Sequence, residues 1–200
     1  MLEIQDLHVK FHSRDREAVG GVSLTIENGE ILGLVGESGS GKSVTAMSVA
    51  GLLPRKQCDY SGKILLDGQE LLHADRAALR KIQGADIGVV FQEPQSCMDP
   101  LMRIGPQVEE VLRIHTDLSR EARRDQALAA LAAVELPDPA GVYRKYPHEL
   151  SGGMKRRAGI AQAMLNDPKI LILDEPTAGL DPKERIRFRN LISELAENRL

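Results

Sequence analysis

Two segments near the start of the chain alternate between apolar and polar side chains. The alternation runs from Leu2 to Gln5 and again from Val22 to Glu27. A period of two puts successive side chains on opposite faces of a strand, so half-buried antiparallel strands are predicted in both segments. The Asn28-Gly29 pair that follows predicts a turn.

Later segments lack this alternation. Short continuous apolar runs, typical of strands buried on both faces of a parallel sheet, occupy residues 31–35, 87–91 and 170–173. A further short strand is predicted from Lys63 to Asp67. Helices, in which apolar residues recur at turn spacing, are predicted at residues 43–53, 119–135 and 182–195 and after Ser151.

Composition and charge exclude several classes of protein. The 200 residues carry a net charge of −3, so we expect no nucleic-acid partner. Cys58 and Cys97 fit no metal spacing and indicate reduced thiols. No run approaches the roughly 18 apolar residues of a membrane span, and the N-terminus does not resemble a signal peptide. We therefore expect a soluble chain that reaches a membrane only through a partner.

A glycine-rich segment between the predicted strand 31–35 and the predicted helix 43–53 fits the pattern G-x-x-x-x-G-K-[ST]. Such a loop turns backbone N–H groups toward phosphate oxygens at a helix N-terminus. Lys42 is expected to reach the β- and γ-phosphates and Ser43 to ligate Mg²⁺. A chance glycine-rich turn is the alternative. The residues expected to hold the nucleotide are Gly36, Ser38, Gly39, Ser40, Gly41, Lys42, Ser43 and Thr45.

Two acids end the apolar run 170–173. At the end of a buried strand they would face the phosphate pocket, with Asp174 holding Mg²⁺ and Glu175 polarising the attacking water as a general base. On its own, a solvated strand end is the commoner explanation of such a pair. The preceding glycine-rich motif makes the catalytic interpretation the stronger one.

The segment Leu150-Ser151-Gly152-Gly153-Met154 resembles the signature of ABC ATPases. The resemblance implies that Ser151, Gly152 and Gly153 close on ATP bound to an opposite subunit, so two such domains would bind two Mg·ATP head to tail. It also implies that Gln92 contacts Mg²⁺ and the attacking water, and that Asp181, in a segment similar to the D-loop, lies between the two sites. Phe11 is the candidate for stacking on adenine, although it could equally be a core residue.

The resemblance covers essentially the whole chain and implies a particular fold. This is a P-loop NTPase (RecA-like) α/β core with a parallel sheet, an N-terminal antiparallel β lobe and an inserted helical subdomain. We expect a single domain over 1–200, incomplete at its C-terminus. Its expected parts are a β lobe (1–30 and 60–70), a P-loop core (31–58, 84–92 and 161–200) and a helical signature subdomain (93–160).

Segments around residues 91–105 and 146–150 are similar to those of peptide and nickel importers. This resemblance implies integral membrane permease subunits docking near 93–107 and a second ATPase subunit, identical or, as is usual there, different. It further implies an extracytoplasmic solute-binding protein, the cofactors ATP and Mg²⁺, and a place on the cytoplasmic face of the cell membrane.

The sequence departs from the family pattern twice. Lys155-Arg156-Arg157 stands where such importers commonly carry Arg-Gln-Arg, which we interpret as a tolerated surface change. The family's switch histidine should follow the D-loop helix, yet the last histidine here is His148. Without the strand that carries it, two buried strands would keep unpaired backbone groups and an exposed apolar face. We therefore expect the 200 residues alone to be poorly stable and nearly inactive.

Two alternatives remain open at this point. One is an ABC ATPase without a permease, which co-purification with a membrane protein would exclude. The other is an inactive truncated remnant, which the missing histidine favours and the intact motifs up to Asp181 oppose.

Overall fold

The computed structural model describes residues 1–92, 97–178 and 182–197, except the side chains of residues 184 and 194–197. The chain divides into two compact units, Met1–Gln83 with Ala196–Leu200, and Gly84–Leu195. Within the described ranges, no helix is long and apolar enough to cross a bilayer. The prediction of a single domain stays a prediction.

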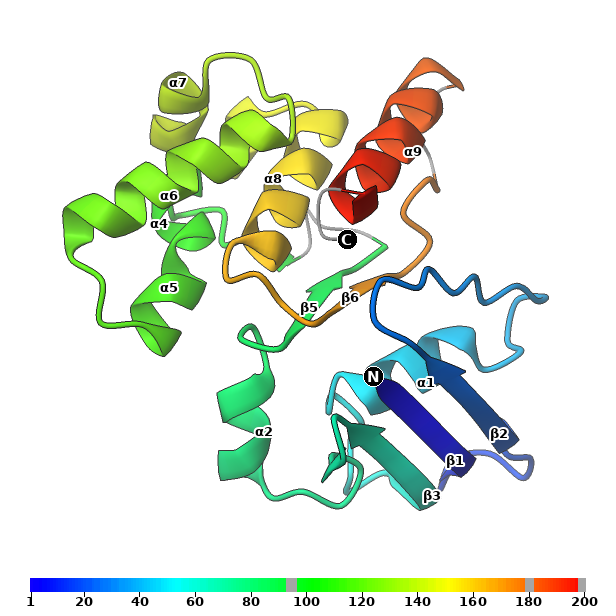
Figure 1. Ribbon diagram of the computed structural model, residues 1–200. Coiled ribbons are helices and arrows are strands. Elements are labelled where there is room, and N and C mark those ends of the chain that lie inside the picture. The colour runs from blue at the N-terminus through cyan, green and yellow to red at the C-terminus, as the bar shows by residue number, and fades with distance from the viewer. Residues whose placement is uncertain (93–96, 179–181, 198–200) are drawn as a thin grey trace. The chain divides into compact units, whose positions relative to one another are not determined.

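The first unit is built on a four-stranded antiparallel sheet with the order β2-β1-β3-β4 (Figure 1). Its strands are β1 (Leu2–Phe11), β2 (Val19–Ile26), β3 (Cys58–Leu66) and β4 (Gln69–Glu70). The two predicted N-terminal strands pair from Leu2↔Ile26 to Val9↔Val19, and residues 28–29 form the predicted turn.

A bulge keeps the apolar side chains of β1 on one face. Leu2 and Ile4 are buried before it, and Leu7 and Val9 after it, so the alternation shifts by one residue. The shift occurs at Asp6, whose φ is 47° and whose N–H donates to Ser23 Oγ at 2.9 Å. If the strand alternated regularly through Asp6 without a bulge, Leu7 and Val9 would face solvent.

The bulge depends on a glycine in the neighbouring strand. Gly62 of β3 has a φ of 96°, and a Cβ there would collide with the carbonyl oxygens of Gln5 and Asp6. Only a residue without a side chain allows the two backbones to approach this closely.

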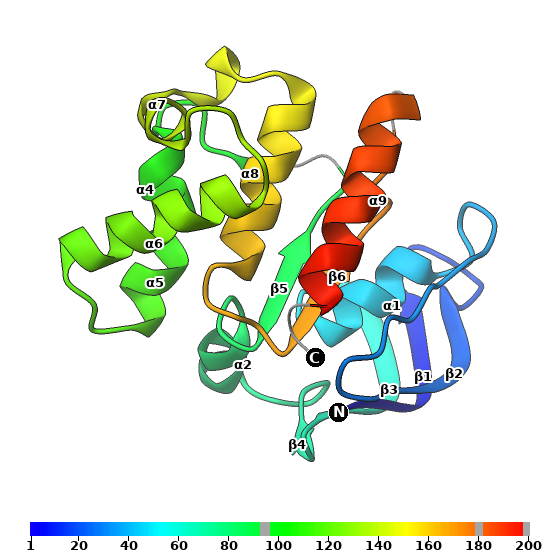
Figure 2. The same cartoon turned by 45° about the horizontal axis from the view of Figure 1, so that its top comes forward.

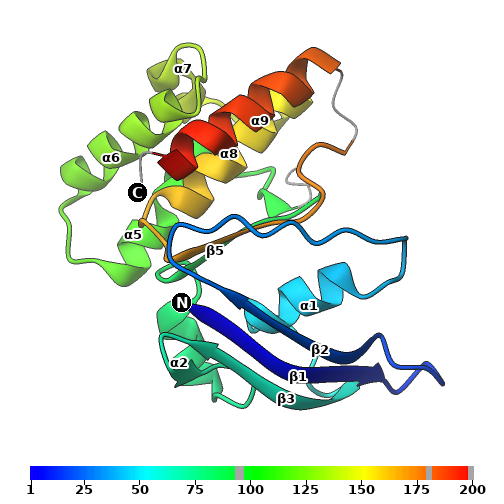
Figure 3. The same cartoon turned by 45° about the vertical axis from the view of Figure 1, so that its right-hand side comes forward.

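Two helices accompany this sheet, α1 (Lys42–Val49) and α2 (Arg76–Ile82). Helix α1 lies along one face of the sheet (Figure 3). Val49 and Ala50 are buried at its end, and Leu79 and Ile82 are the buried residues of α2. The helix predicted over 43–53 ends earlier than expected because Gly51, with a φ of 68°, already adopts a left-handed conformation.

The strand predicted at residues 31–35 is wrong. These residues form no strand, and Ile31 and Val35 are 68% and 97% exposed. The apolar run predicts burial on both faces, but a strand also needs hydrogen bonds to a neighbouring strand. Within the described residues, no strand pairs with this segment.

The second unit surrounds two parallel strands, β5 (Ile87–Val90) and β6 (Ile170–Leu173), paired from Ile87↔Ile170 to Val90↔Leu173. Both were predicted, although β6 is half-buried throughout. The helices described here are α4 (Ile104–Val108), α5 (Glu110–His115), α6 (Arg120–Ala133), α7 (Pro139–Arg144), α8 (Gly152–Met164) and α9 (Pro182–Glu197), with the 3₁₀ helix η1 (Pro147–Glu149).

Helix α8 lies between the two strands and helices α4 to α7 (Figure 1, Figure 2). Helices α4 to α7 gather on the side of α8 away from β5 and β6 (Figure 2). Its residues Ala158, Ile160 and Ala161 are buried in one core with Val90 of β5 and Leu131 of α6. The position of α8 therefore fixes where its N-terminus lies relative to the ends of β5 and β6.

Candidate active site

The glycine-rich loop of the first unit folds around the ammonium group of Lys42. Lys42 Nζ donates to the carbonyl oxygens of Gly36 and Glu37 at 2.7 and 2.8 Å, and lies 3.4 Å from Ser40 Oγ. Residues 31–40, including Gly36, Ser38, Gly39 and Ser40, are all exposed. The loop thus presents a cation and backbone N–H groups to solvent, where an anion can reach them.

The start of α1 is held against the sheet by Gly41. Its φ is 93°, and a Cβ there would collide with the carbonyl oxygen of Ala18. Thr45 is buried, and its hydroxyl donates to Gly41 O at 3.0 Å. This hydrogen bond ties the end of the glycine-rich loop to the first turn of α1. Ser43 is half-buried in the first turn of α1, whose first N–H groups have no partner inside the helix.

Phe11 ends β1 near this helix start. It pairs with Cys58 of β3 and is half-buried. Ala18, which touches Gly41, donates its N–H to Val9 O at 2.8 Å, two residues before Phe11. The ring is therefore exposed enough to stack on a ligand and stands on the same strand that supports the loop.

In the second unit, the carboxyl ends of β5 and β6 bring two predicted residues together. Asp174 N–H donates to Val90 O at 3.0 Å, which continues the parallel pairing one residue beyond β6. Gln92 Nε2 then donates to Glu175 Oε2 at 2.8 Å. Parallel strands end at one edge of a sheet, which explains how residues 83 positions apart come into contact.

Glu175 stands at a sharp turn of the backbone. Its φ of 43° is in the left-handed region, uncommon for a residue with a side chain. Ala178 N–H donates to Glu175 O at 3.0 Å and closes the turn. The side chain of Glu175 is exposed, whereas Asp174 is half-buried beside it. Asp181 lies outside the described residues, as does the segment 93–96.

The signature residues begin α8. Ser151 is its N-cap, and its hydroxyl accepts from Met154 N–H at 3.3 Å. Ser151 and Gly152 are exposed, Gly153 is half-buried, and no atom lies within 4 Å of a Cβ built on Gly152. A capped, open helix N-terminus of this kind suits an incoming anion.

Arg156 was missed as a site residue, and its interpretation as a surface change is wrong. It is only 9% exposed, and its Nη2 donates to Gln92 O at 3.2 Å and to Ala178 O at 3.0 Å. Burial lowers the pKa of Arg156. A cation at a position where similar proteins carry an amide was the available signal, but sequence alone does not give the direction of a side chain on α8.

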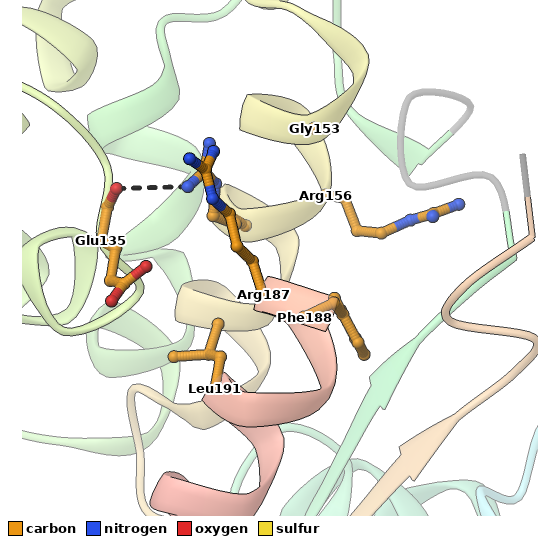
Figure 4. A pocket seen from close by; sticks show the side chains of 7 residues that line it. Glu135, Gly153, Arg156, Arg187, Phe188 and Leu191 are labelled. Carbon is orange, nitrogen blue, oxygen red and sulfur yellow. Dashed lines mark hydrogen bonds between the residues drawn. The ribbon is translucent and has the colours of Figure 1, made fainter. Parts of the chain in front are cut away.

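A hollow lies between α8 and α9 and shares Gly153 and Arg156 with the groups described above (Figure 4). It is lined by Glu135, Gly153, Arg156, Arg157, Arg187, Phe188 and Leu191. It contains neither the glycine-rich loop nor the acids after β6, so we do not assign it to the nucleotide.

The candidate Mg²⁺ residues are one hydroxyl, one amide and one carboxylate, on Ser43, Gln92 and Asp174. Among the described residues, no group of three or more His, Cys, Asp or Glu side chains could hold a metal. This oxygen-donor set fits Mg²⁺, which takes few protein ligands and completes its shell with phosphate and water. It does not fit Zn²⁺, which prefers closed nitrogen and sulfur sites.

Comparison with known proteins relates these features to one protein family. The family profile described as ABC transporter matches residues 19–178. The chain is 43% identical over 199 residues to the probable D,D-dipeptide transport ATP-binding protein DdpD of Escherichia coli, covering 98% of this chain and 61% of that protein. It is 40% identical to the dipeptide transport ATP-binding protein DppD of Bacillus subtilis, covering 98% and 59%. The chain thus spans about 60% of the length of these curated relatives.

A solved structure agrees with the arrangement of elements. The ATP-binding cassette MJ0796, in a dimeric post-hydrolysis state bound to ADP and Pi, superposes with a TM-score of 0.87 and 30% identity. The match covers 99% of this chain and 84% of that chain. It confirms the predicted fold class, a P-loop core with an N-terminal antiparallel sheet and an added helical part.

Proposed function

We propose that this chain, which belongs to the ABC transporter family, binds ATP with Mg²⁺ and hydrolyses it to drive transport through a membrane permease. The observation that carries the proposal is the hydrogen bond of Gln92 to Glu175 at the common edge of β5 and β6. An acid and an amide held together at a strand end can orient a water molecule for attack on a phosphate.

Glu175 acts as the general base in this mechanism. One carboxylate oxygen accepts from Gln92, and the exposed side chain leaves the other able to accept a proton from water. The left-handed backbone of Glu175 aims the side chain beyond the end of β6. Gln92 restricts the carboxylate to one orientation, which favours a productive geometry.

Binding is the task of the glycine-rich loop. Lys42 exchanges its bonds to the carbonyls of Gly36 and Glu37 for bonds to phosphate oxygens, and the N–H groups at the start of α1 bind others. Ser43, Asp174 and Gln92 would hold Mg²⁺. When bound, the metal neutralises charge on the phosphates. Phe11 would stack on the base, and Ser151, Gly152 and Gly153 would bind phosphate on a second subunit.

Peptides are the proposed cargo. DdpD and DppD are both described as dipeptide transport ATP-binding proteins, and the oligopeptide transport ATP-binding protein OppD of Bacillus subtilis is 37% identical over 198 residues. Nickel, the other cargo predicted from the sequence, has no support from these relatives.

The loop at residues 98–102 supports docking on a permease. Leu101 is 85% exposed, yet its N–H is held by Asp99 Oδ1 at 2.8 Å. In the proposed assembly, Leu101 on this hydrogen-bonded loop is a candidate contact with the permease. A second ATPase subunit is proposed because MJ0796 is described as dimeric. An extracytoplasmic solute-binding protein completes the proposed assembly.

Replacing Glu175 with glutamine tests the proposal. Because the amide cannot take a proton, Glu175→Gln should reduce ATP turnover by roughly 100-fold or more while ATP still binds. Phosphate release and nucleotide binding are measured in the chain assembled with its permease. Glu121→Gln, an exposed change on α6, is the control. Turnover by Glu175→Gln at the unaltered rate would show that Glu175 is not the base.

A further inference from the structure

Arg156 closes a ring of hydrogen bonds around the strand ends. Its guanidinium donates to Gln92 O and Ala178 O, at 3.2 and 3.0 Å. The Gln92 side chain donates to the Glu175 carboxylate, and Ala178 N–H donates to Glu175 O. The ring therefore links α8 to both segments that leave the parallel strands.

Arg156 and its neighbour Arg157 on α8 form different contacts. Figure 4 shows Arg156 extending from α8 away from Glu135. The next residue, Arg157, donates instead to Glu135 O at 3.3 Å. Two adjacent arginines thus serve different contacts, and only the first reaches the ends of β5 and β6.

Among the described residues, the buried guanidinium of Arg156 is held by two backbone carbonyl groups. Arg156 is 9% exposed, and within the described part of the chain it forms no ion pair and its Nη1 has no hydrogen-bond partner. Burying a cation without a carboxylate is costly, and an apolar residue of similar size is often at least as stable there. The contacts that Arg156 makes with the described residues therefore favour a role in positioning over one in stability.

We propose that Arg156 is a positioning residue, which holds the backbones of Gln92 and Ala178 so that the Gln92 amide meets the Glu175 carboxylate. Since Arg156 lies in the second turn of the helix that Ser151 begins, movement of that helix is transmitted to both residues. The positioning role in hydrolysis rests on the proposed function, whereas the hydrogen-bonded ring does not.

Three variants separate this role from a general effect on folding. Arg156→Met keeps the apolar stem and removes both bonds. Arg156→Lys keeps a cation and N–H donors without the planar guanidinium. Arg157→Met is the matched control, because it removes an arginine from the same helix turn whose hydrogen bond goes to Glu135 O instead.

Hydrogen exchange of two backbone amides, followed by NMR in the full ATPase subunit, reads out the ring directly. Ala178 N–H belongs to the ring, whereas Asp174 N–H, four residues earlier, bonds to Val90 O in the sheet. Arg156→Met should speed exchange of Ala178 by about tenfold, the effect of losing one charge-assisted hydrogen bond, and leave Asp174 unchanged. Arg156→Lys should restore most of the protection, and Arg157→Met should resemble the unaltered chain.

Unchanged exchange of Ala178 in Arg156→Met, or equal acceleration at Ala178 and Asp174, would overturn the proposal. ATP hydrolysis by the permease assembly gives the second readout: kcat should fall about tenfold in Arg156→Met while KM for ATP stays within about twofold. A rise in KM with kcat unchanged would also overturn it. If the unaltered assembly hydrolysed no ATP, the proposed function would fail, and the exchange data would still decide whether the ring exists.

Discussion

His8 lies between two carboxylates on the exposed side of β1. Its Nδ1 is 3.0 Å from Glu17 Oε2, and its Nε2 is 3.2 Å from Asp6 Oδ1. The hydrogen bond with Glu17 raises the pKa of His8 above its ordinary value most, and the contact with Asp6 raises it further. The protonated ring therefore stabilises the folded chain below the unfolded pKa of about 6.5, and this contribution is lost as the pH rises through the folded pKa.

Glu17→Gln should lower the pKa of His8 toward its ordinary value and weaken this pH dependence of stability. An NMR titration of the imidazole signals measures the pKa, and urea unfolding at several pH values measures the stability. Glu27→Gln, an exposed change at the end of β2, should alter neither. A His8 pKa unaffected by Glu17→Gln would show that this pair is absent in solution.

Residues at strand ends were easier to predict than residues on helices. Gln92 and Glu175 follow apolar runs, and parallel pairing of those runs is enough to bring them to one edge. The role of Arg156 could not be predicted in this way. Its contacts depend on the rotation of α8 about its own axis, and Arg157, one residue later, faces Glu135 instead.

At the scale of single elements, a buried glutamine holds the loop before α4. Gln107 is 8% exposed, accepts from Asp99 N–H at 2.9 Å, and donates to Asp99 O and Met102 O at 3.0 and 2.9 Å. Gln107→Leu would leave these backbone groups without a partner. Urea unfolding followed by circular dichroism should show a loss of about 2 kcal/mol.

The control for this change is Gln126→Leu, the same substitution at an exposed position of α6, expected to stay within about 0.5 kcal/mol. Equal effects of the two substitutions would contradict the role of Gln107. The loop carries the exposed Leu101, so a loosened loop should also weaken association with a permease.

Most long elements could be predicted from periodicity, because the two faces of an amphipathic strand or helix differ in composition. Strands β1, β2, β5 and β6 and helices α6, α8 and α9 are confirmed near their predicted places. Short elements such as α7 have too few residues to show a period. The strand predicted at residues 31–35 is wrong for a different reason, because an apolar run does not specify a hydrogen-bonded neighbour.

At the scale of the whole chain, each compact unit holds one cysteine. Cys58, in the first unit, is 3% exposed, and burial raises the pKa of its thiol. Cys97, in the second, is exposed. A maleimide should therefore react quickly with Cys97 and slowly with Cys58, whose reaction requires local opening of the sheet.

The slow reaction of Cys58 then reports ligand binding by the first unit. Cys58 pairs with Phe11, on the strand that supports the glycine-rich loop, so ATP bound there should stabilise the closed state of β3. In the Cys97→Ser background, Mg·ATP at 100 times its Kd should slow modification of Cys58 by up to about 100-fold, the limit set by linkage. Lys42→Ala should abolish the protection, and Glu175→Gln, in the other unit, should keep it. A rate of Cys58 modification unaffected by saturating ATP would mean that the glycine-rich loop binds no nucleotide.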